Sequence, residues 1–550
     1  LIDAELIDAD SDSRSLPGAT MRASVISYTE DGLYFSLEGA SFNLSLDQHI
    51  AAVGLGNSGK DELAQLLTRL INPTSGTISL GGESFSELPE ALVGRRIAYA
   101  GPSTYLFTGS VRDNLLYPLK NRPVGRLIEG DDKEREAVRR QAELSGNSVD
   151  DISDEWVNLD AIGVIDDADL RDRVHNTLKL VELSDEVYQF GLLSRVDQSN
   201  NVELAGKIMQ ARKKLRGRLL DSQYARLVEP FDHEKYNTNL SVGENLLFGT
   251  IYDDNIDAER LAEHPYIRQV LDSTGLTNDF LTAGQKIAEI MLDLFADVEP
   301  GSELFEQFSF ISGDDLPEFQ QVLQRTRDLQ PREIETADKA LLLSLPFKLV
   351  VTRHRLGLIT ESIQERILDA RNQIQDDAEN RSLGIEFFDE AQYNPRISIQ
   401  DNILFGKLVY GQANAQSRIN ELISEVVDEL GLRGEIVEAG LAYEVGVGGA
   451  RLSSAQRQKL GVARCLLKNP DLLVVNEALS GLDTAAERRI IERICAQMSG
   501  QGIFWVLARV KLAELFGNVM VIERGKLTAE GAYADLAESS EQLRGLLEQE

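Results

Sequence analysis

A glycine-rich loop stands between a short apolar segment and a helical pattern in the N-terminal part of the chain. Residues 50–53 read Ile-Ala-Ala-Val, which indicates a buried strand, and leucines recur at helical spacing over residues 63–70. Between them, residues 54–61 read Gly-Leu-Gly-Asn-Ser-Gly-Lys-Asp. In such a strand–loop–helix unit, backbone N–H groups and the helix N-terminus surround a phosphate, and the lysine adds a mobile positive charge. The pattern predicts phosphate binding by Gly54, Asn57, Ser58, Gly59 and Lys60, with an ordinary glycine turn as the alternative.

The remaining chain shows two kinds of sequence pattern. Strand and turn patterns fill residues 24–119, and apolar strand-like stretches return at residues 471–475, 503–507 and 519–523, with a helical pattern from about residue 485. Strands that alternate with helices indicate a parallel, doubly wound sheet. Residues from about 120 to 450 are helical and acidic in pattern and have few strand signals. We therefore expect one α/β domain that is split by a long, mostly α-helical segment.

The helical segment contains a repeat. Residues 231–249 recur at 388–406, and both stretches contain Phe-Asp, Tyr-Asn and a string that ends in Leu-Phe-Gly. An Ala-Arg pair precedes each stretch, at residues 211–212 and 370–371, and a fainter copy begins at Ser110 and resumes near residues 178–192. We interpret this as a helical subdomain in two clear copies and one degenerate copy. Three unrelated amphipathic helices are the alternative.

The charge of the chain restricts its partners. It has 56 Lys and Arg residues against 90 Asp and Glu residues, a formal net charge of −34. A surface this negative argues against a partner that is bound through its phosphate backbone, so we expect no nucleic acid partner. The two cysteines, Cys465 and Cys495, indicate a cytosolic chain without a disulfide framework.

A second group of motifs lies in the C-terminal part. Residues 446–460 place Leu-Ser-Ser-Ala-Gln (452–456) at the start of a helix, and the strand 471–475 runs into Asn476 and Glu477. Ser-Gly-Leu-Asp follows at residues 480–483. In this order, and together with the loop 54–61, the motifs resemble the nucleotide-binding domain of ABC transporters, particularly of the exporter type. The resemblance covers roughly residues 22–119 and 388–535 and implies a P-loop NTPase fold with a small antiparallel β subdomain.

The resemblance implies a division of the chain into five parts. Residues 1–21 would be a linker, and residues 22–119 the N-terminal part of the nucleotide-binding domain, with the P-loop and the β subdomain. Residues 120–387 exceed the family's usual helical subdomain and would be a helical insertion that grew by duplication. Residues 388–455 would be the helical subdomain that leads to the signature-like motif, and residues 456–550 the C-terminal part of the α/β core.

The resemblance also implies roles for individual residues, because two such domains sandwich ATP head to tail. Tyr28 would stack on adenine, Lys60 would hold the phosphates, and Glu477 would act as the general base that polarises water. Tyr28 as a plain strand tyrosine and Glu477 as a sheet-edge carboxylate are the alternatives. The partner domain's nucleotide would face the signature residues Leu452, Ser453, Ser454, Ala455 and Gln456, and the dimer seam would contain the D-loop residues Ser480, Gly481, Leu482 and Asp483.

Five places depart from the family's pattern. Asp61 replaces a magnesium-binding hydroxyl, Pro102 the Q-loop glutamine, Ser454-Ala455 two glycines, Asn476 the Walker B aspartate, and Arg509 the switch histidine. Hydrolysis needs an aligned water, a metal and charge stabilisation at the γ-phosphoryl group. Groups of this kind are worth roughly 3–4 kcal/mol each, so we predict a site that binds nucleotide and hydrolyses it poorly.

Two of these departures together leave the net charge around the expected metal the same as in the family's pattern. Asp61 adds a carboxylate to the P-loop while Asn476 removes one from Walker B. Asp61 is therefore a candidate ligand of Mg²⁺, with independent decay of an idle site as the alternative.

The resemblance implies the ATP-binding domain of an exporter-like transporter, which couples ATP and Mg²⁺ binding to transmembrane transport at the cytoplasmic face of the cell membrane, with impaired hydrolysis. The expected partners are a transmembrane domain upstream in the same polypeptide and a second nucleotide-binding domain, as a homodimer or heterodimer. The alternative is a pseudo-ATPase regulatory protein whose helical insertion binds a protein partner. An unrelated P-loop kinase would leave residues 446–483 unexplained.

Overall fold

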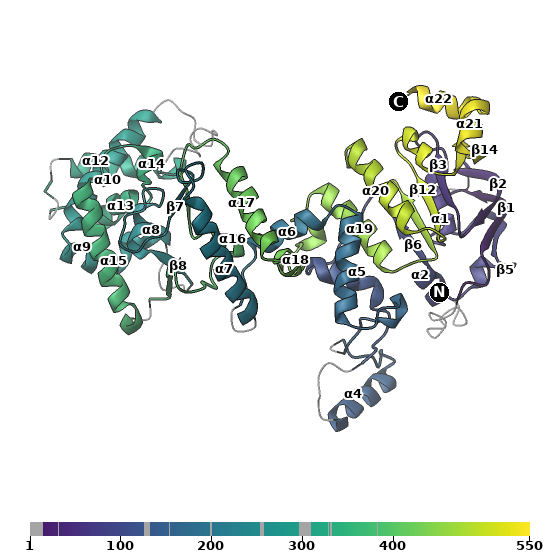
Figure 1. Cartoon of the computed structure of the whole chain (residues 1–550), viewed down its shortest axis with the longest axis horizontal. Coiled ribbons are helices and arrows are strands. Elements are labelled where there is room, and N and C mark those ends of the chain that lie inside the picture. The colour runs from purple at the N-terminus through teal and green to yellow at the C-terminus, as the bar shows by residue number, and fades with distance from the viewer. Residues whose placement is uncertain are drawn as a thin grey trace. The chain divides into compact units, whose positions relative to one another are not determined.

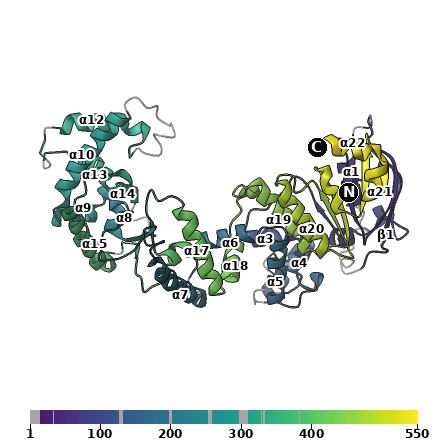
Figure 2. The ribbon, with the colours of Figure 1, turned by 45° about the horizontal axis from the view of Figure 1, so that its top comes forward.

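The computed structural model describes residues 15–549 except 31, 33, 126–131, 153, 198–200, 253–257, 296–309, 328, 331–332 and 382, so most of the expected linker lies outside the described residues. The chain folds into two compact units (Figures 1 and 2). The first comprises Leu1–Gln189 and Gly440–Glu550, and the second comprises Phe190–Ala439. These borders describe packing and do not coincide with the predicted parts, because residues 120–189 pack with the first unit and residues 388–439 with the second.

The first unit is built around a six-stranded sheet with the order β14-β13-β3-β12-β11-β6. All neighbouring strands are parallel except β14, which pairs antiparallel with β13 at one edge. Every residue of the strands β11 and β12 is buried, as expected for parallel strands that are covered on both faces. The predicted α/β fold with a parallel sheet is confirmed. The strands are β3 (His49–Val53), β6 (Ile97–Ala100), β11 (Leu472–Asn476), β12 (Gly502–Val506), β13 (Asn518–Glu523) and β14 (Lys526–Ala532).

A smaller antiparallel sheet packs on the same core. Its order is β2-β1-β4-β5, and its buried side chains share one hydrophobic cluster with β3, β11 and β12. Its strands are β1 (Thr20–Tyr28), β2 (Leu37–Ser45), β4 (Ser75–Leu80) and β5 (Glu83–Ser84). The helices of the first unit are α1 (Lys60–Leu67), α2 (Glu90–Arg96), α3 (Val111–Leu116), α4 (Asp132–Ser145), α5 (Asp167–Leu180), α19 (Ser454–Leu467), α20 (Thr484–Gln497), α21 (Tyr533–Ser539) and α22 (Glu541–Gln549), and two helices, α6 (Ser184–Leu193) and α18 (Arg433–Leu441), cross the border between the units.

The second unit is mostly helical and has its own hydrophobic core. It also contains two small antiparallel sheets, β7 with β10 and β8 with β9, which the sequence pattern did not predict because each strand has three residues. Its elements are α7 (Val202–Leu219), β7 (Val228–Pro230), α8 (Val242–Leu247), β8 (Gly249–Ile251), α9 (Pro265–Ser273), α10 (Leu276–Leu294), α12 (Leu316–Thr326), α13 (Thr336–Phe347), α14 (Val351–His354), α15 (Glu361–Arg381), β9 (Ile385–Phe387), α16 (Ile399–Leu404), β10 (Gly406–Leu408) and α17 (Ala415–Glu429).

The same local structure recurs at the helices α3, α8 and α16. Each helix begins after a serine whose hydroxyl accepts a hydrogen bond from the backbone N–H three residues later. Each contains a fully buried asparagine, Asn114, Asn245 or Asn402. The asparagine side chain exchanges two hydrogen bonds with the backbone of a residue seven or eight positions earlier, and this closes the preceding loop.

Two buried arginines join the repeats of the second unit crosswise. Arg371 on α15 donates to the carbonyl and the side-chain oxygen of Asn245 and lies over the ring of Phe248. Arg212 on α7 makes the same bonds to Asn402 and lies over Phe405. Each arginine therefore packs on the other repeat and not on the one that its own helix directly precedes. Figure 1 shows α15 beside α8 within this unit.

Candidate functional site

The loop between β3 and α1 is held by close backbone approaches. Gly59 has φ +99°, and a Cβ there would lie 2.3 Å from the carbonyl oxygen of Ser36. A Cβ at Gly54 would lie 2.3 Å from the carbonyl oxygen of Ile522. No larger side chain fits at either position without a backbone shift, so the loop keeps its N–H groups close to the end of β3.

The loop brings Lys60 to Glu477. Lys60 is the first residue of α1 and is 3% exposed, and its Nζ forms an ion pair with Oε1 of Glu477. Glu477 directly follows β11 and has φ +47°, a left-handed conformation that few non-glycine residues adopt. Because β3 and β11 are parallel members of one sheet, their carboxyl ends lie at the same edge, where open α/β sheets bind ligands.

A buried polar pair lies next to Glu477. Asn476 is 2% exposed, and its Nδ2 donates a 3.2 Å hydrogen bond to the hydroxyl of Tyr99 on β6. Burial raises the pKa of Tyr99, and the negative charge of Asp61 acts in the same direction. The sequence analysis did not single out Tyr99, because nothing in an apolar strand pattern marks it.

Two buried oxygens at this edge make no hydrogen bond within the described part of the chain, namely Oδ1 of Asn476 and Oγ of Ser58 in the loop. Buried polar atoms are normally paired, so such atoms mark a place for a ligand or cation. The described residues contain no group of three or more His, Cys, Asp or Glu residues that could hold a metal. Mg²⁺, however, is usually bound by one or two protein oxygens together with phosphates and water. Asp61 and the unpaired Oδ1 of Asn476 are oxygen donors of that type, so these residues fit Mg²⁺.

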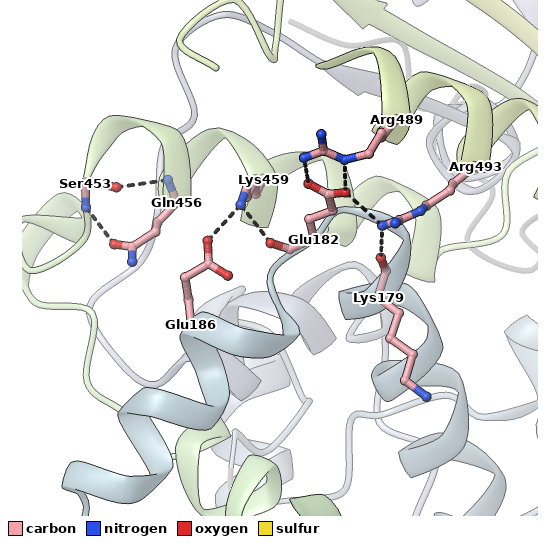
Figure 3. Close-up of polar contacts among 8 residues, drawn as sticks. All are labelled: Lys179, Glu182, Glu186, Ser453, Gln456, Lys459, Arg489 and Arg493. Atoms are coloured by element: carbon pink, nitrogen blue, oxygen red, sulfur yellow. Dashed lines mark hydrogen bonds and ion pairs between the residues drawn. The ribbon is translucent and has the colours of Figure 1, made fainter. Parts of the chain in front are cut away.

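The start of α19 is capped by its own side chains. Oγ of Ser453 accepts from the N–H of Gln456, and Oε1 of Gln456 accepts from the N–H of Ser453, as drawn in Figure 3. Leu452 is buried, while Ser453 and Ser454 are exposed and Ala455 and Gln456 are partly exposed. The segment therefore presents an exposed helix start with its first-turn amides partly capped.

One turn further along α19, Gln458 joins two other predicted motifs. Its Nε2 donates to the carbonyl of Pro102 at 3.4 Å, and its Oε1 accepts from the N–H of Gly481 at 3.0 Å. Gln458 is 7% exposed. The sequence analysis missed this residue, because its partners lie 356 and 23 positions away along the chain.

Comparison with known proteins agrees with this geometry. Residues 37–244, which include the loop 54–61, match the family model described as ABC transporter. A putative export ATP-binding/permease protein of Rickettsia conorii is 33% identical over 150 residues, which cover 27% of this chain and 25% of the relative. An ATP-dependent lipid A-core flippase of Xylella fastidiosa is 30% identical over 149 residues, which cover 25% of this chain and 23% of the relative.

The chain contains an exporter-type ABC nucleotide-binding domain.

The chain spans about a quarter of the length of these relatives. A solved bacterial Atm1-family ABC exporter with ATP bound aligns with 97% of this chain and 42% of its own, at 11% identity and a TM-score of 0.40, which is too low to carry an argument. The family match contains the P-loop and ends before residues 446–483, so the roles of the signature and D-loop residues stay predictions. No helix in the described ranges has the length and apolar character needed to cross a membrane.

In the ABC domain, Arg509 contacts the backbone of residues 480–482, in the predicted D-loop. Its Nη1 forms an ion pair with Glu487, which is 1% exposed, and its Nη2 donates to the carbonyls of Ser480 and Leu482. Asp483 is the N-cap residue of α20, and the hydrogen bond that its carboxylate accepts from the N–H of Ala486 lowers its pKa. The guanidinium group of Arg509 therefore holds the conformation of residues 480–483, which are the predicted D-loop.

Tyr28 is the last residue of β1 and is half-buried. Its ring packs at the border of the hydrophobic cluster that the two sheets share, and its carbonyl accepts from the N–H of Ser36. A contact between Tyr28 and adenine stays a prediction.

Proposed function

We propose that this chain is the ATP-binding part of an exporter-type ABC transporter, in which nucleotide binding is coupled to transport across the membrane and hydrolysis is weak or absent. The observation that carries the proposal is the ion pair between the P-loop Lys60 and Glu477, because it brings the phosphate-binding lysine to the candidate general base. Gly54, Asn57, Ser58 and Gly59 would surround the phosphates with their backbone N–H groups.

Weak hydrolysis follows from what the altered positions can do. A guanidinium group does not exchange protons near neutral pH, and Arg509 already uses its donors on Glu487 and the D-loop carbonyls. Pro102 has no side-chain amide to reach a γ-phosphate. If each of these two groups is worth roughly 3 kcal/mol in the transition state, their loss lowers turnover by several powers of ten.

Asp61 and Asn476 are the residues that we expect to hold Mg²⁺ in the nucleotide complex. The cation would neutralise phosphate charge. The carboxylate of Asp61 would otherwise repel the phosphates, so in this proposal nucleotide and metal bind together.

The expected partners are a transmembrane domain in the same polypeptide and a second nucleotide-binding domain at the cytoplasmic face of the membrane. Relatives that combine ATP-binding and permease parts support the first. The exposed start of α19 supports the second, because Ser453, Ser454 and Gln456 remain accessible to another molecule.

We further propose that residues 120–387 are an insertion that grew by duplication of the stretch from the capped helix to the signature helix. The helices α7, α15 and α19 begin at residues 202, 361 and 454, and each has an Ala-Arg pair whose arginine lies ten positions after its start, at Arg212, Arg371 and Arg464. Each arginine donates to backbone carbonyls in the loop before a capped helix, with Arg464 donating to Tyr105.

A second candidate function is a pseudo-ATPase regulatory protein that binds a protein partner through this insertion. The independent hydrophobic core of the second unit favours it, because that core contains no residue of the nucleotide site. In this alternative the insertion works without ATP turnover.

Calorimetric titration of the 550-residue chain with ATP and Mg²⁺ tests the leading proposal. We expect one nucleotide per chain, loss of binding in Lys60→Ala, and phosphate release that is barely above the uncatalysed rate. Absence of ATP binding in the unaltered chain would refute the transporter proposal and favour the regulatory one. Rapid turnover that Glu477→Gln abolishes would refute weak hydrolysis alone.

A further inference from the structure

A polar cavity lies at the edge of the central sheet opposite the nucleotide site. It has a volume of about 240 Å³ and is bounded by α5, the end of α19, the end of α20 and the segments that lead into β11 and β12. Its polar lining residues are Arg173, Asn176, Thr177, Lys179, Asn469, Gln497 and Gln501. Because the P-loop follows the carboxyl end of β3 and the cavity precedes the amino ends of the parallel strands β11 and β12, the two sites are on opposite edges of the sheet.

The cavity wall contains two cations and no carboxylate. This is unusual in a chain with 90 acidic residues and a net charge of −34. Arg173 is half-buried, and its Nη2 donates to Oδ1 of Asn469 at 3.0 Å, so its guanidinium group is fixed in the cavity wall. Among the described residues, neither Arg173 nor Lys179 forms an ion pair.

The basic side chains next to the cavity differ from Arg173 and Lys179, because carboxylates neutralise their charge. The carboxylate of Glu182 accepts from both Nε and Nη2 of Arg489 and lies 3.1 Å from Nη1 of Arg493, and Glu186 binds Lys459 (Figure 3). Arg493 also donates to the carbonyl of Lys179. These contacts fix the turn between α5 and α6 against α19 and α20.

A desolvated guanidinium without a counter-ion is costly, and burial lowers the pKa of Arg173 accordingly. An anion in the cavity would remove this cost. Guanidinium groups match phosphate oxygens with two parallel N–H donors, and two further lining residues, Asn176 and Gln497, carry side-chain amides. The volume is below that of typical drug-sized pockets, which limits the ligand to a phosphate with few further atoms.

We propose that this cavity binds a small phosphate-bearing anion, inorganic phosphate or a small phosphomonoester, with Arg173 as its main anchor.

The test uses the full chain in a Lys60→Ala background, which removes phosphate binding at the P-loop. Calorimetric titration with inorganic phosphate at low ionic strength should show one site per chain. Adding Arg173→Gln should weaken binding at least tenfold, and Arg173→Lys should retain part of it. The matched control is Arg171→Gln, which removes the same charge from an exposed position of α5 that does not line the cavity, and it should leave the affinity unchanged.

Two further arms identify the source of the anion. Glycerol 3-phosphate that binds as tightly as inorganic phosphate would identify a phosphomonoester, and much weaker binding would identify free phosphate. The proposal is overturned if phosphate does not bind in the Lys60→Ala background, if Arg173→Gln binds like its parent, or if acetate binds as well as phosphate. Circular dichroism of Arg173→Gln shows whether the variant is folded. Because Lys60 is already replaced, the result is independent of ATP binding at the P-loop.

Discussion

The ammonium group of Lys60 is bound to the carboxylate of Glu477, although the two residues lie 417 positions apart in the chain. The lysine is almost completely buried, and the glutamate is 28% exposed. In the proposed nucleotide complex, a triphosphate in the loop would compete with this carboxylate for the lysine. We therefore expect the pair to lower the affinity of the site for nucleotide.

Replacing Glu477 with glutamine should strengthen ATP binding. The substitution removes the negative charge that competes for Lys60, and a charge-assisted hydrogen bond is worth about 1.5–3 kcal/mol. We expect about tenfold tighter binding in calorimetry. Glu492→Gln, on the exposed face of α20, is the matched control and should have no effect. Weaker binding in Glu477→Gln would contradict the competition between carboxylate and phosphate.

Chelation of Mg²⁺ should weaken ATP binding strongly. Without the cation, Asp61 would repel the phosphates by about 4 kcal/mol at 4 Å and an effective dielectric constant near 20. Asp61→Ser should therefore bind ATP with a much smaller difference between Mg²⁺ and EDTA. Glu62→Ser removes the neighbouring carboxylate in the first turn of α1 and serves as the control. Equal effects of the two substitutions would exclude direct ligation by Asp61.

Removing the Arg509 side chain should destabilise the first unit. Arg509→Met removes the ion pair of Arg509 with the buried Glu487, and breaking a buried pair costs about 3–5 kcal/mol. Because Arg509 is 29% exposed, we expect about 3 kcal/mol in urea unfolding. Adding Glu487→Gln should recover part of this loss. Arg524→Met, at a position where the side chain is 92% exposed, should change the stability by less than about 0.5 kcal/mol.

Acid should destabilise the second unit through His354. Burial lowers the pKa of His354 from 6.5 to about 4, and its Nδ1 accepts a hydrogen bond from the N–H of Val350. The unfolded chain therefore takes up the proton first, and the free energy of unfolding falls between pH 6.5 and pH 4. His354→Asn keeps an acceptor for Val350 and removes the titration. Thermal unfolding at pH 7 and pH 4.5 should show a smaller difference in this variant than in the unaltered chain, and an equal difference would refute the assignment.

Much of the nucleotide site was predictable because its parts are local. The strand 50–53, the glycine loop and the helix from Lys60 are consecutive, so their spacing alone predicted this strand–loop–helix unit. Tyr99 and Gln458 were not predictable in the same way. Their partners Asn476 and Pro102 come from other strands and loops, and apolar or helical periodicity carries no information about such contacts.

The sequence by itself indicated the P-loop, because the strand, the glycine loop and the helix are consecutive, and it indicated the α/β class, because strand and helix patterns alternate. The tertiary structure alone decided which repeat each buried arginine joins. Asn245 and Asn402 offer Arg212 and Arg371 the same oxygens, so local chemistry does not distinguish them. The packing of α7 on α16 and of α15 on α8 determines which arginine pairs with which asparagine. It brings each guanidinium group within hydrogen-bonding distance of one asparagine.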